Sequence, residues 1–195
     1  AYKTEQAVDM ETSAIVAVTT HGGAAADTAT MDETVTEAGV AVAEVMLEQT
    51  PEGEYVVNPD GIEEVVADKG YHSNEVLTQF AELELRTYFS EPDRGRRNWQ
   101  GPTGAEAQAA VYANRRRITG DRGKRLLARR GEFLERTFAH CYETGGMRRL
   151  HVRGAANITK RLLLHAAAFN LSLMMRKLLG AGTPRGFAAR LAALS

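Results

Sequence analysis

Cysteine is almost absent from this sequence of 195 residues. Cys141 is the only one, so the chain cannot form an intrachain disulfide, and a cysteine-based zinc site is not expected. The five histidines show no spacing typical of zinc ligands, which argues against a histidine zinc site as well. Scarce cysteine is typical of reducing compartments and predicts a cytoplasmic location.

Long hydrophobic runs and nucleotide-binding fingerprints are also missing. The longest apolar tract, residues 162–175, is too short to span a bilayer and contains His165 and Asn170, so we expect no membrane association. There is no phosphate-binding loop and no dinucleotide motif, so we expect no small-molecule cofactor. The hydrophobic content of 44% and the charged content of 25% are ordinary for one globular domain.

Basic residues are rare in the first part of the chain and crowded in the rest. Residues 1–85 contain 2 basic and 18 acidic side chains, and residues 86–195 contain 22 basic and 7 acidic ones, although the whole chain has a net charge of −1. Such asymmetry is typical of proteins in which one half binds a polyanion. The alternative is that the two halves neutralise each other within one fold.

The first half alternates between the periodicities of strands and helices. A polar turn around Asp9 separates two strand-like segments, which predicts a β-hairpin. Asp9 is expected to bond nearby backbone amides within that turn. The predicted order is a hairpin over 2–8 and 14–20, a helix over 30–49, a strand over 62–68, a helix over 74–84 capped by Ser73, and a strand over 85–90. This order predicts an α/β fold.

The second half of the sequence lacks the alternating pattern of strands. Helices are predicted over 105–118, 124–142 and 155–179, with a break at 119–123 and an extended or turn segment at 147–152. A loop rich in proline, glycine and arginine precedes them at 91–104, and loops of this kind often carry function. We predict one domain over 1–180 and a loose C-terminal tail over 181–195.

Asp68 follows the buried strand segment Val65–Ala67 and precedes Gly70, which ends the strand. Open α/β sheets place ligand-binding and catalytic groups at the carboxyl ends of such strands. The alternative for a single aspartate in this position is that it caps the next turn.

Glu135 is the second candidate acid. Leu134, Phe138 and Cys141 form an apolar stripe on the predicted helix, and Glu135 lies at its margin. Taken alone it would be a solvated helix residue. Together with Asp68, however, it can hold divalent metal ions for phosphoryl transfer. Such hard oxygen ligands suit Mg²⁺, or Mn²⁺ in its place.

The arginines around these acids predict a substrate with a phosphate backbone. Trp99 lies among them and could stack on an unpaired base, although packing against the sheet is the alternative. The predicted DNA-binding residues are Arg94, Arg96, Arg97, Trp99, Arg115, Arg116, Arg117, Arg129, Arg130, Arg148 and Arg149.

Several motifs resemble one family when they occur together in this order. These are Val66-Ala67-Asp68-Lys69-Gly70-Tyr71, the segment from Arg130 through Glu135 to Phe138, and the glycine- and arginine-rich segment 142–154. The sequence thereby resembles the DDE transposases of bacterial insertion sequences over roughly residues 1–180. One departure is Tyr142, in a region where the family often has a basic residue.

The resemblance implies a ribonuclease H-like α/β fold, with a mixed sheet, an N-terminal β-hairpin and a helical C-terminal half. It implies DNA cleavage and joining that depends on Mg²⁺, with Asp68 as the second catalytic aspartate and Glu135 as the catalytic glutamate, both binding metal. It also implies DNA as the partner, a possible homo-oligomer on DNA, and a bacterial location at the nucleoid when bound.

The same resemblance implies an aspartate on a first strand, upstream of the hairpin. No residue of this sequence matches that position, because Asp9 lies in the hairpin turn. We therefore expect an incomplete first strand and a C-terminal portion of a transposase that is inactive alone. Two alternatives remain: a non-catalytic DNA-binding module that uses residues 86–195, and a protein-contact role for the helix over 155–179.

Overall fold

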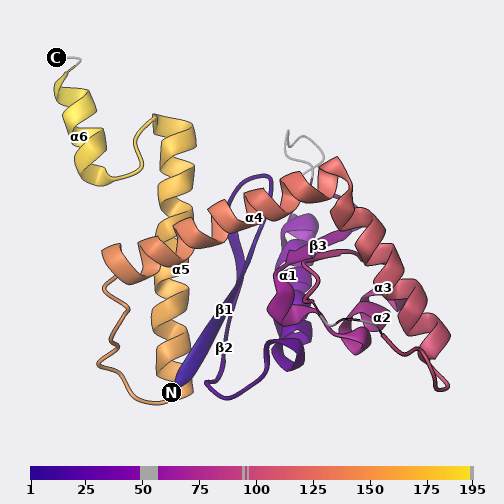
Figure 1. The fold of residues 1–195 in the computed structure, drawn as a ribbon. Coiled ribbons are helices and arrows are strands. Elements are labelled where there is room, and N and C mark those ends of the chain that lie inside the picture. Colours follow the sequence, from indigo (N-terminus) through magenta and orange to yellow (C-terminus); the bar gives the residue numbers. More distant parts are fainter. Residues whose placement is uncertain (49–56, 94, 96, 194–195) are drawn as a thin grey trace. The chain divides into compact units, whose positions relative to one another are not determined.

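The computed structural model describes residues 1–48, 57–93, 95 and 97–193. The chain divides into two compact units, one made of residues 1–23 and 133–195 and the other of residues 24–132 (Figure 1). Each unit has its own hydrophobic core. The assignment of residues 1–180 to one domain stays a prediction.

The first unit is built on the predicted β-hairpin. Strands β1 (Tyr2–Val8) and β2 (Ile15–Gly22) pair antiparallel, with an irregularity at Ala7/Val8. In the turn between them, the backbone N–H of Thr12 donates to the carboxylate of Asp9 over 2.7 Å. Asp9 thus has the structural role predicted for it.

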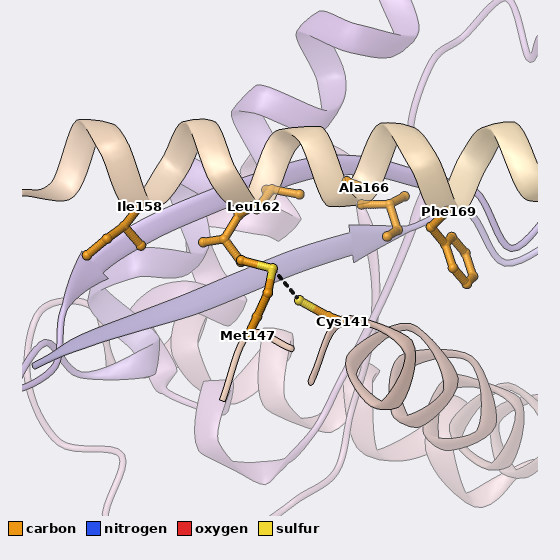
Figure 2. Close-up of a cluster of buried hydrophobic side chains, with 8 residues drawn as sticks. Cys141, Met147, Ile158, Leu162, Ala166 and Phe169 are labelled. Carbon is orange, nitrogen blue, oxygen red and sulfur yellow. Dashed lines mark hydrogen bonds between the residues drawn. The ribbon is translucent and has the colours of Figure 1, made fainter. Parts of the chain in front are cut away.

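Helix α5 (Ala155–Leu179) packs on β2 and forms the core of this unit. Ile158, Leu162, Ala166 and Phe169 recur along one face of the helix at the spacing of helical turns and are buried. Figure 2 shows these side chains with Cys141 and Met147, whose sulfur atoms lie 3.3 Å apart. Burial of the only cysteine raises the pKa of its thiol.

The opposite face of α5 is apolar and exposed. It carries Leu164, Leu171, Met174 and Leu178. By length and composition alone α5 could cross a membrane, although the tract 162–175 taken by itself is too short. The expected absence of membrane association therefore stays a prediction.

The C-terminal tail differs from its prediction. Helix α6 (Pro184–Ala192) follows α5 inside the segment expected to be loose. Its N-terminus is capped by Thr183, whose hydroxyl accepts the backbone N–H of Gly186 over 3.0 Å, and proline occupies the first turn. Threonine followed at once by proline is a helix-start signal, and it accounts for a helix in this segment.

The second unit contains a parallel strand pair with helices packed against it. Strand β3 (Glu64–Ala67) pairs in parallel with β4 (Arg86–Phe89), and α2 (Asn74–Glu82) connects them. Ser73 caps α2 by accepting the backbone N–H of Val76, as predicted. Helix α1 (Asp27–Glu48) begins three residues before the predicted start, and the predicted last residue, Gln49, lies outside the described chain.

The core of the second unit lies where the β3–β4 pair, α2 and α3 (Gly104–Thr119) meet. Leu77, Phe80, Phe89 and Val111 are almost completely buried there. The rings of Phe80 and Phe89 pack edge to face with their centroids 6.0 Å apart. This core fixes the carboxyl end of β3, at which the first candidate acid lies.

Helices α3 (Gly104–Thr119) and α4 (Asp121–Ala139) follow each other almost directly. The predicted break at 119–123 is shorter than expected, because Gly123 lies within the first turn of α4. A β-carbon at Gly123 would lie 2.1 Å from the carbonyl oxygen of Arg117, so glycine permits this close corner. After Ala139 the chain continues as a π-helix over His140–Thr144 (η2), and the segment 147–152 forms no strand.

The two strand pairs are separate sheets in the described chain, one antiparallel (β1–β2) and one parallel (β3–β4). An α/β fold with small sheets is confirmed, but the single mixed sheet of the prediction is not. Its strand order depends on long-range pairing, which local periodicity does not encode.

Candidate active site

Asp68 lies directly after β3, with 47% of its side chain exposed. It also caps the short 3₁₀ helix Lys69–Tyr71 (η1), since its Oδ1 accepts the backbone N–H of Gly70 over 2.9 Å. The turn-cap role and an accessible carboxylate are therefore compatible. The exposed carboxylate remains available to a ligand.

The surroundings of Asp68 include one cation and a second carboxylate. Nη2 of Arg130 lies 3.2 Å from Asp68 Oδ2. A β-carbon built at Gly70 would lie 2.6 Å from Asp27 Oδ2 and 3.1 Å from Asp68 Oδ1, so both carboxylates flank this glycine. Local sequence patterns do not single out Asp27, because it lies 41 positions before Asp68 and the packing of α1 on η1 brings it close.

Glu135 lies on α4 and is exposed. The buried face of this part of α4 carries Phe133 and Thr137, while Leu134 and Phe138 are only half buried. Of the predicted apolar stripe, Cys141 is buried as expected, whereas burial near Leu134 and Phe138 falls one position earlier. Glu135 belongs to the first unit and Asp68 to the second, so each is described in its own surroundings.

The residues present suit a hard divalent cation better than a soft one. In the described chain, no group of three or more histidine, cysteine, aspartate or glutamate side chains is close enough to hold a metal ion. Asp68 and Glu135 offer only oxygen donors, which are the ligands that Mg²⁺ and Mn²⁺ prefer. The donor chemistry fits magnesium, and Asp68 is accessible enough to act as a ligand.

Two of the arginines predicted to bind DNA are engaged by a glutamate. Arg115 donates from Nε and Nη2 to the carboxylate of Glu91, at 2.8 and 2.7 Å. Arg97 donates to the same carboxylate over 2.8 Å and to Asn74 over 3.0 Å. The hydrogen bond from Arg115, with the charge of Arg97 nearby, lowers the pKa of Glu91, so this carboxylate neutralises part of the basic charge.

Arg117 supports a strand edge. Its Nε donates to the carbonyl of Thr87 over 2.8 Å, and its Nη2 donates to the Thr87 hydroxyl over 2.9 Å. One turn earlier on α3, Asn114 bonds both backbone groups of Phe89. Helix α3 thus satisfies the outer edge of β4 through side chains, a role that a run of three arginines does not reveal.

The remaining predicted DNA contacts differ in accessibility. Arg148 is 70% exposed and pairs with Glu143, Arg130 pairs with Asp68, and Arg94 and Arg96 lie outside the described residues. Arg116, Arg129 and Arg149 are also exposed. These three side chains can therefore offer positive charge to a DNA backbone.

Trp99 packs against the core of the second unit and is only partly exposed. Its ring centroid lies 6.2 Å from that of Tyr112, and the guanidinium of Arg97 lies 5.7 Å from the Trp99 ring. A β-carbon at Gly104 would lie 2.0 Å from the Trp99 carbonyl oxygen. These contacts favour the structural alternative for Trp99.

Comparison with known proteins adds one decisive observation. Residues 94–175 match a family model described as the transposase DDE domain. The resemblance to DDE transposases is confirmed over this stretch. It covers somewhat less than half of the chain and includes Glu135 but not Asp68. No curated protein and no solved structure matches the sequence.

Proposed function

We propose that the chain is a catalytic portion of a DNA transposase, whose complete form cleaves and joins DNA strands by metal-dependent phosphoryl transfer. The observation that carries this proposal is the transposase DDE domain match over 94–175. DNA as the partner follows from the same match. The endonuclease step, an origin in an insertion sequence and assembly into a homo-oligomer on DNA belong to the proposal.

In the proposed centre, Asp68 and Glu135 are the catalytic acids and hold Mg²⁺, or Mn²⁺ in its place. The bound metal would supply Lewis-acid stabilisation of the charge that develops on the phosphate. Support for Asp68 comes from its position at the carboxyl end of β3 and its accessible carboxylate. Support for Glu135 comes from the family match and its exposed position on α4.

We further propose that this chain alone cleaves DNA at most slowly. Only two acids, Asp68 and Glu135, occupy predicted catalytic positions. The fold of the domain is proposed to be ribonuclease H-like, in line with the family match. Strand cleavage by the chain alone at the rate of an intact transposase would contradict this part of the proposal.

The experiment compares binding of a labelled DNA duplex with Mg²⁺ and with EDTA, for the wild type, Asp68→Asn, Glu135→Gln and the control Glu132→Gln. A metal-dependent gain in affinity that is lost in Asp68→Asn and Glu135→Gln, but kept in Glu132→Gln, supports the proposal. Salt-sensitive binding that is indifferent to metal and to both acids would instead support a non-catalytic DNA-binding module.

A further inference from the structure

Arg130 is the cation beside Asp68 in the described chain. Its Nη2 approaches Asp68 Oδ2 at 3.2 Å, and only 22% of its side chain is exposed. Its Nε is buried and has no hydrogen-bond partner among the described residues. The guanidinium therefore bonds Asp68 through a single nitrogen, without the second parallel bond that strengthens arginine–carboxylate pairs.

The carboxylate of Asp68 is engaged on both oxygens. Oδ1 accepts the backbone N–H of Gly70 and Oδ2 is held by Arg130. The hydrogen bond at Oδ1 orients the carboxylate within the turn, and a cation approaching Asp68 can leave it intact. The contact at Oδ2 is different, because a divalent cation and the guanidinium would compete for the same charge.

Whether a divalent cation can displace Arg130 from Asp68 depends on how strongly each of them binds the carboxylate. A partly exposed, single-contact ion pair changes a binding equilibrium by no more than about 5-fold. The carboxylate of Asp27 lies near the same turn and adds negative charge that favours a doubly charged ion over a singly charged one. The pair between Arg130 and Asp68 is thus strong enough to hold Asp68 and weak enough to be displaced.

We propose that Arg130 is a displaceable counter-ion, which neutralises Asp68 in the metal-free chain and must leave Oδ2 when a divalent cation binds. Arg130 is then a positioning residue that sets the metal affinity of Asp68. This inference rests on the proposed role of Asp68 as a metal ligand. It goes beyond that role, because it assigns to a predicted DNA-binding arginine a function that requires no DNA.

The test is Mn²⁺ binding, measured by electron paramagnetic resonance at 0.15 M salt without DNA. Removing the competing pair should tighten binding about 1.5- to 5-fold in Arg130→Gln, and Arg125→Gln, at an exposed arginine on the same helix, serves as a matched control with unchanged binding. Asp68→Asn should lose the site. If Arg130→Gln binds Mn²⁺ as the wild type does or more weakly, while Asp68→Asn still loses the site, this inference is wrong. The proposed metal site at Asp68 would then still stand.

A second measurement uses the wild-type chain and does not depend on how Arg130→Gln folds. Titration with Mg²⁺ should shift the Nε–H NMR signal of Arg130, and this shift should be absent in Asp68→Asn. A signal that stays fixed while Mg²⁺ binds at Asp68 contradicts the displacement. If Asp68→Asn binds Mn²⁺ as the wild type does, the proposed metal site itself is wrong, and the inference falls with it.

Discussion

The side chain of Asn114 closes two hydrogen bonds on the backbone of Phe89. Phe89 N–H donates to Asn114 Oδ1 over 2.8 Å, and Asn114 Nδ2 donates to the Phe89 carbonyl over 2.9 Å. Both residues are fully buried. In the first unit Asn170 makes the same pair of bonds to Ile15, at 2.9 and 2.8 Å. In each unit, an asparagine side chain on a helix thus makes the two hydrogen bonds that a neighbouring strand would make at a sheet edge.

Replacing Asn114 with alanine should lower the free energy of unfolding by about 2–4 kcal/mol, because it leaves a buried N–H and a buried C=O without partners. Urea unfolding followed by circular dichroism measures the loss. Asn157→Ala is the control, since Asn157 is exposed and donates only to the carbonyl of Arg153. A loss below about 0.5 kcal/mol in Asn114→Ala would contradict the role assigned to this side chain.

The presence of most helices and of the short strands was predictable because it depends on local patterns, although several helix boundaries differ from the predicted ones. Ser73 before α2, the hairpin turn around Asp9 and the apolar face of α5 all act within a few residues of their own position. Asn114 and Arg117 were not predictable in their roles. Their partners on β4 lie 25 and 30 residues away, so the contacts exist only after the chain has folded.

The same contrast between local signals and long-range contacts applies to the candidate site. Asp68 was identifiable because a strand-end aspartate before glycine is a local signal. The contact with Arg130 spans 62 residues, and the approach of Asp27 depends on how α1 packs on η1. The arginines predicted to bind DNA were chosen because they are clustered in the sequence. Several of them bond glutamates or backbone groups instead, since clustering along the chain does not distinguish a solvated charge from a paired one.

The corner between α3 and α4 gives a prediction with its control on the same helix. Gly123→Ala should destabilise the chain by about 1–3 kcal/mol, because the new methyl group would meet the backbone of Arg117 and Ile118 at 2.1 and 2.7 Å. At Gly131 a β-carbon meets no atom within 4 Å, so Gly131→Ala should be neutral or stabilise by up to about 1 kcal/mol. Thermal unfolding of both variants tests this, and equal stability would contradict the close corner.

Stability should also decline in mild acid because of a histidine pair. His140 Nδ1 lies 2.9 Å from His165 Nε2. Burial, with the charges of His140 and Arg161, lowers the pKa of His165 from its ordinary value of 6.5. The unfolded chain therefore binds the proton more readily, so this contribution to stability is full above pH 6.5 and declines as the pH falls toward the lower, folded-state pKa.

Urea midpoints measured from pH 8 to pH 5 test the histidine pair. The pH dependence between about 6.5 and 5 should be smaller in His165→Gln than in the wild type. His151→Gln is the control, because His151 is exposed. An unchanged dependence in His165→Gln would show that other groups cause the decline.

The exposed arginines should dominate the affinity for DNA. Replacing Arg116, Arg129 or Arg149 with glutamine should reduce the slope of log affinity against log salt by about 0.9 for each lost phosphate contact. Arg117→Gln should instead lower stability, since Arg117 bonds Thr87. Fluorescence anisotropy over a salt series, with thermal unfolding of each variant, separates the two effects. A larger slope change in Arg117→Gln than in Arg116→Gln would contradict this assignment.

The most direct test of the central claim, that Asp68 and Glu135 hold the same metal centre, is Mn²⁺ affinity in a double-mutant cycle of Asp68→Asn and Glu135→Gln. The account predicts that each variant weakens binding, and that the double variant loses clearly less than the two single losses combined, because ligands of one centre are coupled. Wild-type Mn²⁺ affinity in Glu135→Gln, or losses that add without coupling, would contradict the shared centre.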